Sequence, residues 1–111
     1  MALELFDEDI RMHLTALLSS RDRTVDRCLE SLRIPRSTDT VAPETLDWPP
    51  EIVGRAFALS RRLGNNEVGR THLLLAFLDS RTEKVRAFLE IDGATCARLR
   101  EDLYSALNPG E

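Results

Sequence analysis

Two histidines and two cysteines are the residues of this sequence best suited to catalytic chemistry. A cysteine nucleophile needs a histidine beside it and an electropositive, partly open setting. Cys28 and Cys96 both fall on apolar stripes of helical segments, and neither belongs to a metal-ligand spacing. We predict that both are buried core residues, with a disulfide as the alternative. No catalytic residue, metal site or cofactor is assigned, and the chain is not expected to be an enzyme.

His72 is the sharpest single candidate, because it stands directly before six apolar residues, Leu73 to Leu78. It could act as a general base or a metal ligand. No partner for it lies nearby in the sequence, so we favour a structural role in which its ring bonds a nearby loop carbonyl and orients a helix. His13 is expected to be exposed.

Composition bounds the class of protein. A chain of 111 residues is one domain in length. The net charge of −4 is spread without a strongly basic half, which argues against nucleic-acid binding, since that needs a concentrated cationic face. No apolar run approaches the length of a membrane span, so we expect a cytoplasmic protein without a membrane partner.

Apolar residues recur at helical spacing along most of the chain, and no strand pattern competes. We predict an all-α single domain, residues 1–111, with two helices in 3–34, a proline-rich linker over 35–48 and four helices in 49–109. Trp48, at the end of the linker, either covers the core or forms a docking patch, and we favour the first.

Several residues are predicted to begin or end the helices of 49–109. Pro49 and Pro50 can open the first of them, and Gly64 can end it in a left-handed conformation. The segment after Gly69 is apolar nearly all round, which is typical of a central buried helix. Predicted N-terminal caps for the next helices are Thr71, Ser80 with Glu83, and Thr95, the last after a break at Gly93.

A partial internal repeat appears when the chain is shifted by 60 residues. Residues 12–31 overlay 72–91 without gaps, and eight of the twenty pairs are identical. This pattern suggests two copies of one helix-loop-helix unit.

The second copy resembles the repeat of the Clp ATPase N-terminal domain. The shared features are the "RRLG" helix end, the "VG-x-x-H-LLL-A-x-L" helix, the "x-FLE" helix and a glycine before the last helix. The resemblance covers residues 49–107 well and 9–34 weakly. It implies a Clp N-domain-like bundle of two four-helix repeats, the second complete and the first truncated. In that family the domain receives substrates and adaptor proteins for a hexameric unfoldase.

The sequence departs from the family in three respects. No G-x-x-x-x-G-K-[ST] motif is present, so an unfolding motor would have to be a separate chain. The first repeat lacks its opening helix and its closing one. Where the family motif has an acidic residue before the histidine, which in some unfoldases holds a phosphorylated arginine, this chain has Arg11 and Thr71. We predict that phosphoarginine recognition is lost, because neither residue can accept hydrogen bonds from a guanidinium as a carboxylate does.

These observations favour a free-standing, non-catalytic protein-binding module that regulates Clp-dependent proteolysis or acts as its decoy. His72, Gly64 and Gly93 are assigned structural roles, and a homodimer could cover apolar surface left by the truncated repeat. The alternative is a small helical nucleic-acid-binding regulator that uses the helices of 49–91 as a helix-turn-helix. The residues predicted to bind a partner protein are Arg11, Asn65, Asn66, Glu67, Arg70 and Thr71.

Overall fold

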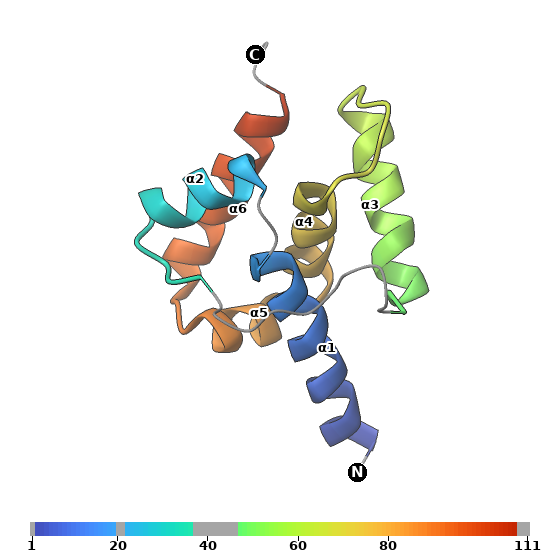
Figure 1. Ribbon diagram of the computed structural model, residues 1–111, viewed down its shortest axis with the longest axis vertical. Coiled ribbons are helices and arrows are strands. Elements are labelled where there is room, and N and C mark those ends of the chain that lie inside the picture. Colours follow the sequence, from blue (N-terminus) through green and yellow to red (C-terminus); the bar gives the residue numbers. More distant parts are fainter. Residues whose placement is uncertain (1, 20–21, 37–46, 109–111) are drawn as a thin grey trace.

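The computed structural model describes residues 2–19, 22–36 and 47–108, with the backbone alone for 2–7. These parts of the chain form an all-helical fold without strands, as predicted (Figure 1). In chain order the helices are α1 (Ala2–Ser19), α2 (Arg23–Ser31), α3 (Pro50–Arg62), α4 (Arg70–Ser80), α5 (Thr82–Leu89) and α6 (Gly93–Leu107). Residues 37–46 of the predicted linker lie outside the described residues.

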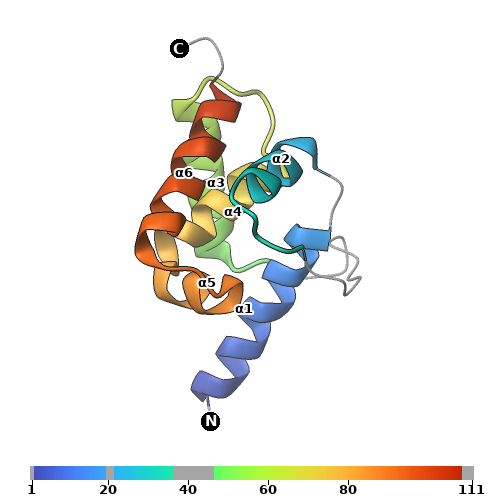
Figure 2. The same ribbon diagram turned by 90° about the vertical axis from the view of Figure 1, so that its left-hand side faces the viewer.

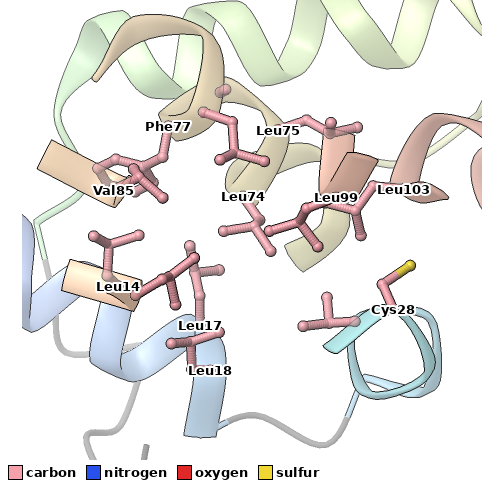
Figure 3. Close-up of a cluster of buried hydrophobic side chains, with 14 of the residues drawn as sticks. Leu14, Leu17, Leu18, Cys28, Leu74, Leu75, Phe77, Val85, Leu99 and Leu103 are labelled. Atoms are coloured by element: carbon pink, nitrogen blue, oxygen red, sulfur yellow. The ribbon is translucent and has the colours of Figure 1, made fainter. Parts of the chain in front are cut away.

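Helix α4 is the centre of the fold. Its residues 71, 72 and 74–78 are buried, and it packs against α1, α2, α3, α5 and α6. Leucine and phenylalanine side chains from α4 meet those of α1 and α6 in one cluster, with Cys28 of α2 at its edge (Figure 3). Each large apolar side chain removed from water contributes about 1.5 to 3 kcal/mol. The prediction of a central buried helix is therefore confirmed.

The two ends of α3 and the position of Trp48 against the core also agree with the prediction. Pro49 precedes α3, and Pro50 occupies its first turn. A backbone N–H at that position has no acceptor within the helix, so proline costs no hydrogen bond there. Gly64 has a φ of 74° and ends the helix, with the Asn65 N–H bonded to the Ser60 carbonyl at 2.9 Å. Trp48 is half-buried against the core.

Three predicted caps are wrong, because a neighbouring residue takes each position. Helix α4 begins one residue before Thr71, with Gly69 as its N-cap. Ser80 is the last residue of α4, and a single residue separates that helix from α5. Thr95 gives its N–H to the Asp92 carboxylate at 2.8 Å, so Asp92 caps α6 and Gly93 is its first residue. A carboxylate is the stronger acceptor for the free N–H groups of a first helical turn.

Burial follows the internal repeat. At five of the eight identical pairs both residues are buried: Leu14/Leu74, Ala16/Ala76, Leu18/Leu78, Val25/Val85 and Leu29/Leu89. A residue of left-handed backbone follows each of α2 and α5: Arg33 (φ 58°), two residues after α2, and Glu90 (φ 57°), directly after α5. The N-terminal half of α1 extends beyond the other helices, so the molecule is longest in that direction, 45 Å against 28 and 24 Å (Figures 1 and 2).

Candidate protein-binding surface

His72 joins the start of α4 to the loop before it. Its Nδ1 accepts a hydrogen bond from the Gly69 N–H at 2.8 Å, and its Nε2 lies 2.8 Å from Oδ1 of Asn65. Because Nδ1 accepts, the proton of the neutral ring is on Nε2, which donates to Asn65. Burial lowers the pKa of His72, and the charge of Asp22 acts against this. The neutral ring thus connects the loop to α4 through the backbone N–H of Gly69 and the side chain of Asn65. We had expected a bond to a loop carbonyl.

Ser60 is a second residue that shapes this loop, and sequence reasoning did not single it out. Its side chain is buried, and Oγ lies 3.1 Å from the Asn65 carbonyl and 3.3 Å from the Glu67 carbonyl. The available signal was its place four residues after Ala56 on the apolar stripe of α3. A hydroxyl there needs a partner, and the returning loop supplies two carbonyls.

The residues predicted to contact a partner differ in their exposure. Asn66 and Glu67 are exposed, whereas Asn65 and Arg70 are half-buried. Thr71 is buried, and its Oγ1 lies 3.4 Å from Oδ2 of Asp22. Thr71 therefore offers no side chain to a partner, because the first turn of α4 packs beside the residue that caps α2.

Arg11 lies in a different place, in a groove between α1 and α5. Arg70 is the first residue of α4, whereas Arg11 lies beside residues that follow the end of that helix. An 11-residue helix spans about 16 Å. The structure thus separates Arg11 from the loop that carries the other candidates.

The groove between α1 and α5 has a volume of about 690 Å3. Its floor is apolar, and its edges carry two acidic and two basic residues. The α1 wall contributes Glu8, Ile10, Arg11 and Leu14, and the α5 wall contributes Glu83, Lys84, Ala87 and Phe88. A concave apolar surface with a charged edge is suited to bind a protein segment.

His13 was expected to be exposed, and this expectation was wrong. Only 1% of its surface is accessible, and the ring of Trp48 lies over it with centroids 4.5 Å apart. Its Nδ1 lies 2.7 Å from the Asp9 carbonyl, and its Nε2 lies 2.8 Å from the Asp47 carbonyl. The cause is the segment directly before α3, because Asp47 accepts a bond from the ring and Trp48 covers it.

The other groups considered for chemistry are in the core. Cys28 and Cys96 are free and buried, and burial raises the pKa of both thiols. A thiol that stays protonated is a poor nucleophile. Within the described residues, no three His, Cys, Asp or Glu side chains come together as metal ligands, and no helix is long and apolar enough to cross a membrane.

Comparison with known proteins gives no match to this chain, whether with family models, curated proteins or solved structures.

Proposed function

We propose that this chain is a non-catalytic protein-binding module that holds a segment of a partner protein in the groove between α1 and α5. The groove itself is the observation that carries the proposal. Ile10 and Leu14 are buried in the floor, while Phe88 is half-buried and faces the open volume. Covering the rest of this apolar surface would contribute about 25 cal/mol for each Å2 removed from water.

The charges at the edge define the chemistry of the partner. Glu8 and Arg11 line one side, and Glu83 and Lys84 line the other. A segment that fits places an apolar side chain on Phe88 and charged side chains of both signs outside it. Charges at the rim select the partner and its orientation more than they add affinity. The occupant is therefore an amphipathic protein segment with mixed charge.

The resemblance to the Clp repeat supports the choice of partner. Residues 68–78 carry the helix motif of that repeat, and those from Arg70 onward lie in the buried central helix α4. These 111 residues carry no ATP-binding motif, so the unfolding motor lies outside them. The partner is then a Clp unfoldase, an adaptor or a substrate, and the module regulates the unfoldase or competes with it. Asn66, Glu67 and Arg70 remain candidates for a second contact.

A pair of matched substitutions tests this proposal. Ala87→Arg places a long charged side chain in the groove, whereas Ala97→Arg makes the same change at an exposed position of α6 outside it. The immobilised wild-type domain and the two variants are incubated with lysate of the native cell, and bound proteins are identified by mass spectrometry. Clp components should be retained by the wild type and Ala97→Arg and lost by Ala87→Arg. Equal recovery by all three would refute the groove as the binding site.

A further inference from the structure

Helix α3 is fastened at both ends by a buried histidine. His13 of α1 bonds the carbonyl of Asp47, three residues before α3 begins. His72 of α4 bonds Asn65 and Gly69 in the loop that follows α3. The two rings are 1% and 4% exposed, so water cannot replace these bonds while the fold is intact.

The two histidines need different numbers of protons. Both ring nitrogens of His13 face backbone carbonyl oxygens, at 2.7 and 2.8 Å, and a carbonyl oxygen only accepts. Two N–H groups are needed to satisfy both contacts, and only the imidazolium has two. A neutral ring would turn one lone pair toward a carbonyl oxygen at less than 3 Å.

His72 has the opposite requirement. The Gly69 N–H points at Nδ1 from 2.8 Å, so this nitrogen must be unprotonated. A proton on Nδ1 would oppose two N–H groups and remove the bond that holds the loop to the start of α4. Only the neutral ring, with its proton on Nε2, satisfies both Gly69 and Asn65.

We propose that His13 and His72 form a pH-operated switch at the two ends of α3. Protonation of His13 fastens the segment of Asp47 and Trp48 to α1, and protonation of His72 frees the loop of residues 65–69 from α4. Acidification therefore tightens the N-terminal connection of α3 and loosens the C-terminal one. Deprotonation of His13 has the reverse effect at the N-terminal connection.

The charged groups around each ring are compatible with these assignments. On its own helix, His13 has Oδ1 of Asp9 at 3.6 Å from Nδ1. The rings of Trp48 and Phe77 cover it from the segment before α3 and from α4, and neither carries a charge. His72 is influenced by Asp22, before α2, while its direct contacts in the loop are uncharged.

Nuclear magnetic resonance of the histidine rings tests the proposal on the wild-type domain, between about pH 8 and about pH 5, where histidines titrate. We expect His72 to show only the Nε2–H form at about pH 8, and His13 to carry two ring N–H protons at about pH 5. Protection of the Gly69 amide should fall as His72 gains its second proton. A His13 that stays a singly protonated ring throughout would overturn the proposal, and so would Gly69 protection that ignores the titration of His72.

The emission of Trp48, the single tryptophan, gives an independent readout. Its ring is 4.5 Å from that of His13, and an imidazolium quenches indole emission more strongly than a neutral imidazole. We expect emission to fall on acidification in the wild type and in His72→Gln. In His13→Gln, which keeps an N–H donor but does not titrate, this change should be absent. A transition that persists in His13→Gln, or that His72→Gln removes, would contradict the assignment.

Discussion

Thr71 and Asp22 link the first turn of α4 to the start of α2 across 49 residues of sequence. Oγ1 of Thr71 lies 3.4 Å from Oδ2 of Asp22, whose Oδ1 accepts the N–H of Thr24 at 2.9 Å. One carboxylate thus caps α2 and also accepts a hydrogen bond from Thr71 in the first turn of α4. The residue directly before His72 is therefore enclosed between two helices.

This link predicts energetic coupling between the two residues. Asp22→Ala should destabilise the domain by about 1 to 2 kcal/mol, because α2 loses its N-cap. Thr71→Val should cost about 1 kcal/mol, since the carboxylate loses a donor. The double variant should be more stable than the sum of the single effects predicts, by about 0.5 kcal/mol or more. Urea unfolding of the four proteins measures this, and strict additivity would show that the contact does not contribute.

The positions of Thr71 and Arg11 also predict that the domain does not bind phosphoarginine. Thr71 is buried, and Arg11 is a cation at the edge of the groove. Neither provides a carboxylate that could accept the guanidinium hydrogen bonds. Isothermal titration with free phosphoarginine should show no saturable heat. Saturable micromolar binding would mean that another acceptor on this chain has taken over the role.

We expect glycine substitutions at Arg33 and Glu90 to increase the stability of the domain. Both are exposed and have left-handed backbone, φ 58° and 57°, where a side chain is strained. Arg33→Gly and Glu90→Gly should each stabilise the domain by about 0.5 to 1 kcal/mol. Gly64→Ala, at φ 74° with open space around the added Cβ, should cost a similar amount. Thermal unfolding measures all three, and destabilisation by both glycine substitutions would contradict the backbone argument.

Stability should depend on pH through His72. Burial lowers its pKa below the ordinary value of 6.5, so the unfolded chain takes up this proton first as the pH falls. The contribution of the neutral ring is therefore complete above about pH 6.5 and is lost progressively below it. The difference in unfolding free energy between wild type and His72→Gln isolates this effect from that of His13. A difference that grows on acidification would contradict the sign.

Local sequence patterns predicted the helices but not the long-range contacts. The apolar run from Leu73 to Leu78 indicated a central helix, because only a buried helix tolerates apolar residues on all sides. His13 was misplaced because the segment that covers it begins 34 residues later in the chain. Ser60 was missed for a similar reason, since the carbonyls that satisfy it belong to a loop whose path no pattern specifies. The groove depends on how α1 packs against α5, which residue spacing alone does not fix.

The fold also bears on the alternative of a nucleic-acid regulator. A recognition helix must expose polar side chains to base edges in the major groove. In α4 the side chains of residues 71, 72 and 74–78 are buried. This helix cannot take that role while the fold is intact, and the net charge of −4 gives no electrostatic support for binding phosphates.

Site-specific photo-crosslinking in the native cell tests the groove most directly. A photoreactive amino acid replaces Ala87 in the groove or, as the control, Ala97 on α6. We predict that irradiation joins the Ala87 position to one Clp unfoldase, adaptor or substrate, while the Ala97 position gives no such product. The same products from both positions, or none from Ala87, would contradict binding through the groove between α1 and α5.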